Sequence, residues 1–156
     1  MTAIVVATAV GAAYVGGTFY AFSTFVMKAM AALSPSAGAA AMQEINRKAL
    51  TPLYMVGLFG TAAGSLGIGV QAVADWSTPR SVYLVAGAAS YLVGVFVLTA
   101  VYHVPRNNRL DTVDPTSPEG HAYWAKYQSE WTRWNHLRAT AGLAGAALLV
   151  AATRIG

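Results

Sequence analysis

The sequence contains no cysteine, and only 10% of its residues are charged. The absence of thiols excludes disulfides, thiolate catalysis, iron–sulfur clusters and cysteine-based zinc sites. Soluble domains carry about 25% charged residues, so the low charge content argues against a protein that is surrounded by water. Hydrophobic residues make up 56% of the chain, which indicates that it folds in a lipid bilayer.

Several common functional motifs are also missing. The chain has no P-loop, no dinucleotide-binding glycine motif, no HExxH zinc motif and no nucleophile-elbow pattern. No acidic residue lies in the middle of an apolar stretch, which argues against a proton-coupled pump. The basic residues do not alternate with stacking residues along a soluble face, so nucleic-acid binding is not predicted.

The chain does contain a series of long apolar stretches. Residues 1–27, 49–74 and 81–102 carry no charged side chain. A membrane-spanning helix needs roughly 20 apolar residues, so each of these stretches can cross a bilayer. Residues 139–153 form a shorter stretch, which can continue a helix that begins upstream near Ser117.

The apolar stretches define the expected fold. Residues 1–27 lack the basic start of a signal peptide, and their apolar part is too long for one, so we expect them to be retained. We predict an all-α fold with a single domain over residues 1–156. It is a four-helix transmembrane bundle whose long fourth helix, from about Ser117 to about Arg154, extends to the cytoplasmic side.

Proline marks the expected helix boundaries. Ser34 before Pro35, and likewise Thr51 before Pro52, combine a capping side chain with proline at the first helical position, which predicts a surface helix and then the second span. Pro105 follows the third apolar stretch and has no backbone donor, so we expect the third span to end there. The residues after it, as far as Ser117, are predicted to form a loop.

Basic residues are distributed unevenly between the two sides that four spans define. One side carries the connections 28–51 and 103–138, and the other carries both termini and the turn 75–80. The first side holds Lys28, Arg47, Lys48, Arg106, Arg109, Lys126, Arg133 and Arg138, and the second holds Arg80 and Arg154. Because cytoplasmic loops are enriched in Lys and Arg, we expect a bacterial-type cytoplasmic membrane, cytoplasmic longer connections and external termini. Thr112 is then cytoplasmic and Ser77 external.

Two strings near the C-terminus concentrate the polar residues, YHVPRNNRLD (102–111) and WTRWNHLR (131–138). Because successive residues of a helix are rotated by 100°, aromatic side chains of the fourth helix fall on one face. An amide and a guanidinium lie on the same face, at the end nearer the membrane. The members of this face are Trp124, Tyr127, Gln128, Trp131, Trp134, Asn135 and Arg138. The aromatic rings can stack on a flat aromatic ligand, or they can form an interfacial belt at headgroup level.

The two strings also contain two of the three histidines. His103 ends the third apolar stretch and His136 precedes the fourth, so both are expected at a similar depth. Two imidazoles can act as acid and base or bind a metal. Alternatively, each is an interfacial histidine that is hydrogen-bonded to backbone or to an asparagine.

Arginine and asparagine provide the remaining candidate groups. The guanidinium groups of Arg109 and Arg138 can hold an enolate or a carboxylate with two hydrogen bonds, or they can orient the spans and contact lipid headgroups. Asn107, Asn108 and Asn135 can donate to a developing oxyanion, or they can cap helix ends and loop carbonyls. Asn46, in the other connection on the same side, can face the same cluster, or it is a residue of a surface helix.

The strings HVPRNNRLD and WTRWNHLR, with MQEIN (42–46) between the first two spans, resemble the anthrone oxygenase-like membrane proteins. The resemblance covers nearly the whole chain and implies a small four-helix integral membrane protein. Some members of that family oxidise phenolic anthrones to anthraquinones with O₂ and no recognised cofactor. The motif match carries over Asn46, Asn108, Arg109, Trp131, Trp134, Asn135 and Arg138, with His103 and His136 inside the matched strings.

The leading hypothesis is therefore a cofactor-independent oxygenase that acts on a lipophilic aromatic small molecule. One histidine takes a proton from an activated carbon, Arg109 and Arg138 hold the enolate with a neighbouring asparagine, and the tryptophans stack on the rings. One alternative is a metal or haem protein with His103 and His136 as ligands. Another is a non-catalytic membrane subunit that binds a partner or membrane lipid, and the sequence also allows a homo-oligomer.

Overall fold

The computed structural model describes residues 2–76 and 78–155, so Ser77, which was expected outside the membrane, lies outside the described residues. All regular secondary structure in these residues is helical, which confirms the all-α prediction. The elements are α1 (Thr2–Ala21), π-helical η1 (Phe22–Val26), α2 (Met27–Ala31), α3 (Pro35–Lys48), α4 (Pro52–Ala74), α5 (Pro79–Tyr91), π-helical η2 (Leu92–Val97) and η3 (Thr99–His103), α6 (Val104–Thr112) and α7 (Pro118–Ala152).

The predicted helix starts are confirmed. The side-chain oxygens of Ser34, Thr51 and Ser117 accept hydrogen bonds from backbone N–H groups three residues later, at 3.3, 3.3 and 3.0 Å. Each cap is followed by proline at the first helical position. These bonds satisfy donors that a helix end otherwise leaves unpaired, so the start of each helix can be read from local sequence.

The predicted end of the third span at Pro105 is wrong. The helix continues through Pro105 as α6, and Pro79–Thr112 forms one run of 34 residues. The preceding turn is π-helical, with the Val104 N–H bonded to the carbonyl of Thr99. Because this turn is wider than an α-helical one, it accommodates the proline ring, which would otherwise clash with a carbonyl of the preceding turn.

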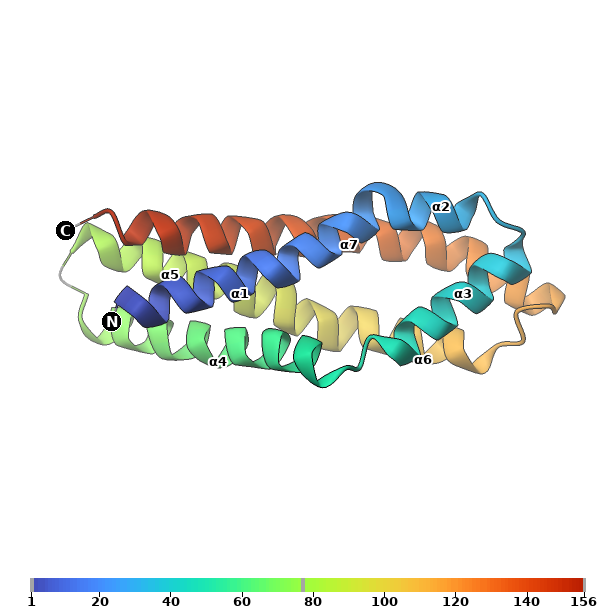
Figure 1. Ribbon diagram of the computed structural model, residues 1–156, viewed down its shortest axis with the longest axis horizontal. Coiled ribbons are helices and arrows are strands. Elements are labelled where there is room, and N and C mark those ends of the chain that lie inside the picture. The colour runs from blue at the N-terminus through green and yellow to red at the C-terminus, as the bar shows by residue number, and fades with distance from the viewer. Residues whose placement is uncertain (1, 77, 156) are drawn as a thin grey trace.

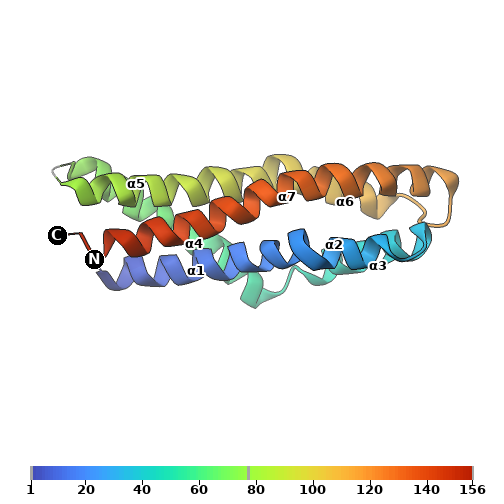
Figure 2. The same cartoon turned by 90° about the horizontal axis from the view of Figure 1, so that it is seen from above.

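The long helices α1, α4, α5 and α7 lie side by side along the molecule (Figures 1 and 2). Both termini and the α4–α5 turn are at one end, while α2, α3, α6 and the first half of α7 form the other (Figure 1). Glycine brings α1 and α7 into backbone contact, because a Cβ on Gly16 would lie 2.9 Å from the backbone nitrogen of Leu143. Such close approach lets helices pack in lipid, where no hydrophobic force drives them together.

Three helical runs are long and apolar enough to cross a membrane: Thr2–Ala31, Pro52–Ala74 and Pro79–Thr112. The outer face of α4 exposes large apolar side chains, which is the pattern expected of a helix in contact with lipid. They are Leu53, Val56, Phe59, Leu66 and Val70. The chain is therefore an integral membrane protein.

Outside the apolar part, α3 is attached to α6. The side-chain amide of Gln43 donates to the carbonyls of Leu110 and Val113, at 2.8 and 2.9 Å. Arg47 forms ion pairs with Asp111 of α6 and with Glu44 of its own helix. The hydrogen bond from Arg47, followed by its charge, lowers the pKa of the exposed Glu44 carboxyl. These contacts hold α3 and α6 together at the polar end of the molecule.

Candidate functional site

His103 is the last residue of η3, and its side chain is 0% exposed. The imidazole makes edge-to-face contacts with the rings of Trp131 and Tyr102, with centroids 5.1 and 5.4 Å apart. Neither ring nitrogen forms a hydrogen bond of standard geometry among the described residues, although the Trp134 backbone lies close to the ring. Buried polar atoms without partners are rare in folded proteins, so this imidazole is the first candidate for a group that acts on a ligand.

Arg138 of α7 is a second buried polar group, with its side chain only 3% exposed. Its Nε and Nη2 donate to the amide oxygen of Asn135 at 3.1 and 2.6 Å, and its Nη1 donates to the hydroxyl of Thr99 at 3.2 Å. The guanidinium carbon lies 3.5 Å from the centre of the Phe19 ring. No carboxylate among the described residues forms an ion pair with it.

Asn135 connects the arginine to the first helix. It is 0% exposed, and its amide nitrogen donates to the carbonyl of Phe19 and to the hydroxyl of Ser23, both at 2.8 Å. With both ends of the amide bonded, its oxygen is held against Arg138. The guanidinium is therefore fixed by neutral groups, and its charge remains available to an anionic ligand.

The helical runs Thr2–Ala31 and Pro79–Thr112 both contain π-helical turns near Arg138. Ser23 lies in η1, and Thr99 and His103 lie in η3. A π turn shifts the direction of the side chains that follow it, and such turns are frequent at functional sites. The geometry of these turns positions the polar groups that surround Arg138.

Three aromatic rings of α7 lead from the polar end of the molecule to His103. Trp124, Tyr127 and Trp131 are buried, and successive ring centroids are 5.8 and 6.0 Å apart at 22°. Tyr127 Oη and Trp131 Nε1 both donate to the amide oxygen of Asn107, at 2.7 and 3.0 Å. These bonds fix the Trp131 ring against His103.

Both Asn107 and Asn108 were candidates from the sequence, but the family resemblance carried over only Asn108, and Asn108 is exposed. The difference follows from the continuation of the helix through Pro105, because adjacent residues of a helix point about 100° apart. Extending the third span into α6 would have placed His103, Asn107 and Leu110 on one face with the helical i, i+4, i+7 spacing. The helical spacing that identifies Asn107 was therefore present in the sequence, but it was missed because this segment was predicted to be a loop.

Of the other predicted residues, some lie at the edge of this cluster and some lie away from it. Asn46 is half-buried close to Tyr127, and its amide nitrogen forms no hydrogen bond of standard geometry among the described residues. Trp134 is 39% exposed and packs on Tyr102, with ring centroids 4.8 Å apart. Arg109 is exposed, with its guanidinium carbon 4.8 Å from the centre of the Tyr123 ring.

His136 is exposed and lines a groove between α2 and α7. It is one residue beyond Asn135, so it leaves the face of α7 that carries Trp131 and Arg138. The structure therefore does not bring His103 and His136 to one site, either as an acid–base pair or as ligands of one metal. Among residues 2–76 and 78–155, no group of three or more His, Asp or Glu side chains is placed to hold a metal ion.

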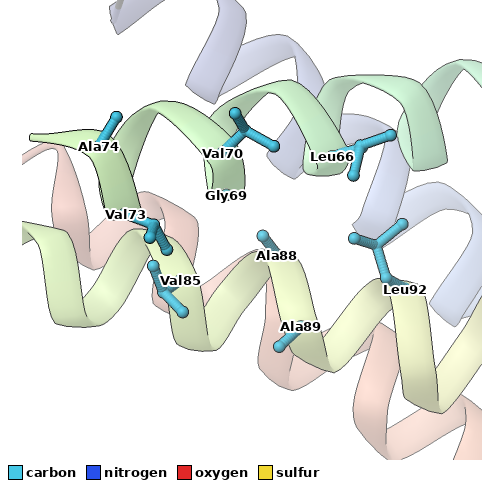
Figure 3. A pocket seen from close by; sticks show the side chains of 9 residues that line it. All are labelled: Leu66, Gly69, Val70, Val73, Ala74, Val85, Ala88, Ala89 and Leu92. Atoms are coloured by element: carbon cyan, nitrogen blue, oxygen red, sulfur yellow. The ribbon is translucent and has the colours of Figure 1, made fainter.

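A separate apolar groove of about 550 Å³ lies between α4 and α5 (Figure 3). Glycine, alanine and larger aliphatic residues line it: Leu66, Gly69, Val70, Val73, Ala74, Val85, Ala88, Ala89 and Leu92. None of these side chains can donate or accept a proton, so the groove offers no group for chemistry.

The candidate site is thus made of His103, Arg138, Asn135 and Trp131, with Thr99 and Asn107 as supporting partners. A family profile described as Anthrone oxygenase matches residues 50–148, which is more than half of the chain and includes all six. The chain has no match among curated proteins or among solved structures. On the extent of the family match, the chain belongs to the anthrone oxygenase family.

Proposed function

We propose that the protein is a membrane-embedded oxygenase that oxidises a lipophilic, anthrone-like phenol with O₂ and without a cofactor. The observation that carries this proposal is the pairing of two buried groups. His103 has two ring nitrogens without a hydrogen bond of standard geometry, and Arg138 has a guanidinium that no described carboxylate neutralises. A neutral base together with a fixed cation favours removal of a proton from carbon, because the base accepts the proton and the cation stabilises the resulting enolate.

In the first step, His103 takes a proton from the methylene carbon between the two aromatic rings of the substrate. The electron pair of the broken C–H bond moves onto the carbonyl oxygen and gives an enolate. Arg138 has five N–H groups, of which three are used by Asn135 and Thr99, and the other two can bond the enolate oxygen. This interaction grows with the negative charge, so it favours the transition state over the neutral substrate.

The enolate then transfers electrons to O₂, and a C–O bond forms at the same carbon. The resulting peroxide anion takes back the proton from His103 and becomes a hydroperoxide. Loss of the second proton from that carbon, with cleavage of the O–O bond, gives the ketone and releases water. One O₂ is consumed for each anthraquinone and water formed, so atoms and electrons balance without a further reductant.

The rings around His103 suit an aromatic substrate. Trp131 is held by its bond to Asn107, and Tyr102 and Phe22 also contact this tryptophan–histidine pair. Flat, apolar substrates dissolve in the bilayer, so the membrane itself can supply them. Expulsion of water around His103 strengthens its electrostatic interactions with the charged intermediate.

The purified protein in lipid nanodiscs tests this proposal directly. We expect oxygen uptake in the presence of a hydroxyanthrone, above the rate measured without protein, with one O₂ consumed per quinone formed. The rate is expected to survive dialysis against a chelator. A rate that stays at the protein-free level, or one that returns only when a metal is added, would contradict a cofactor-independent oxygenase.

We further propose that α7 is the fourth crossing helix and that the site faces the cytoplasm. The 35 residues of α7 extend about 52 Å at 1.5 Å per residue, which is longer than the hydrocarbon core. The polar first half would stand beyond the membrane with α3 and α6. Basic residues are concentrated at this end, which supports the cytoplasmic orientation.

Single cysteines in this cysteine-free chain test the orientation. Thr112→Cys at the end of α6 is expected to react with a membrane-impermeant maleimide only when the cytoplasmic side is accessible. Thr78→Cys, in the turn before α5, is expected to react from outside in intact cells. Labelling of Thr78→Cys only from the cytoplasm would reverse the proposed topology.

A further inference from the structure

The groove between α2 and α7 has a volume of about 410 Å³ and a composition unlike that of the apolar groove. Met27, which is buried, and Ala31, which is exposed, are its apolar lining residues, and the other lining side chains are polar or basic. The lining residues are Met27, Lys28, Ala31, Gln128, Ser129, Thr132, Arg133 and His136. None of them is acidic, so the groove combines an apolar surface with positive charge.

The two permanent charges of this groove are not neutralised locally. Lys28 and Arg133 are exposed and form no ion pair with a carboxylate in the described part of the chain. Glu130, which is the nearest acidic residue in sequence to Arg133, pairs with Arg106 and Lys126 instead. An anion in the groove would therefore meet two cations without competition from a protein carboxylate.

The groove also lies at the boundary between the apolar and the polar parts of the helices that line it, α2 and α7. Lys28 is the first charged residue of the chain, and no charged residue follows Arg138 until Arg154. Basic side chains at this level can reach headgroup phosphates, while apolar residues one turn away remain in contact with acyl chains. Met27 is apolar and Lys28 is basic, so α2 offers a contact for an acyl chain next to a contact for a phosphate.

We propose that this groove binds an anionic glycerophospholipid, with its phosphate held by Lys28 and Arg133 and an acyl chain against Met27 and Ala31. The guanidinium of Arg133 can contact two phosphate oxygens at once, and Ser129 and Thr132 supply neutral donors beside it. Apart from Gln128, the residues of α7 that line the groove lie on a different face from Trp131, Asn135 and Arg138. The lipid site is therefore independent of the proposed oxidation chemistry.

Native mass spectrometry of the full chain in detergent tests the proposal with phosphatidylglycerol and with phosphatidylcholine of the same acyl chains. We expect phosphatidylglycerol to be retained more tightly. The variants Lys28→Gln and Arg133→Gln should each weaken its binding about fivefold, and the double variant by about the product of the two effects. The charge-conserving variant Lys28→Arg should retain most of the binding.

The matched control is Lys48→Gln, which removes one exposed positive charge at the same end of the molecule but outside the groove. It is expected to bind phosphatidylglycerol as the unmodified chain does. Equal retention of the two lipids, or an equal loss in Lys48→Gln, would overturn the proposal. Displacement of bound lipid by millimolar inorganic phosphate, with no preference between the lipids, would show a simple anion site and would also overturn it.

Discussion

Oxygen uptake with a hydroxyanthrone is expected to fall by about 10²–10⁴-fold when His103 is replaced by glutamine, which is the contribution typical of a general base. Glutamine fills a similar volume and keeps polar atoms in the site, but it cannot accept the proton. The measurement is the initial rate of oxygen consumption in nanodiscs, corrected for the protein-free rate. Thermal unfolding of the same sample checks that the variant remains folded.

His136→Gln provides the comparison, because the sequence alone placed both histidines in the candidate site. His136 is exposed in the groove between α2 and α7, so its substitution is expected to leave most of the rate. A normal rate in His103→Gln combined with a large loss in His136→Gln would transfer the role of base to His136. Normal rates in both variants would remove histidine from the proposed chemistry.

Arg138→Lys is expected to lower the rate of oxygen uptake by about 10²-fold, although the charge is retained. The planar guanidinium bonds Asn135 and Thr99 and keeps further donors for the enolate. The ammonium group of lysine cannot make all of these bonds at once. The loss should appear mainly in kcat, because the enolate forms only after the substrate has bound. Membrane insertion should be unchanged, since topology depends on charge.

Arg133→Lys is the matched control on the same helix. Arg133 is exposed and lies on a different face of α7, so the same chemical change there is expected to leave the rate of oxygen uptake unchanged. If both arginine variants are equally damaged, the effect does not come from the buried site. If neither variant is affected, the polar cluster anchors the protein in the membrane and the oxygenase proposal should be abandoned.

The sequence by itself determined the features that depend on local composition and periodicity. Uncharged apolar stretches predicted the helices that can cross a membrane, and serine or threonine before proline predicted where α3, α4 and α7 begin. Helical spacing predicted a shared face of α7, and Trp124, Tyr127, Trp131, Asn135 and Arg138 of that face are buried. Gln128 is half-buried and Trp134 is exposed, although both were placed on the same face. Helical periodicity is local, so no knowledge of neighbouring helices was needed.

Only the tertiary structure decided which polar groups meet. The bonds from Asn135 to Phe19 and Ser23 join residues more than a hundred positions apart, and no local pattern predicts them. The continuation of the helix through Pro105 depends on a π-helical turn, and it selects Asn107 over Asn108. Packing also buried His103 in η3, while it left His136 of α7 in a groove, because His136 is one residue beyond the buried Asn135 and lies about 100° around the helix from it.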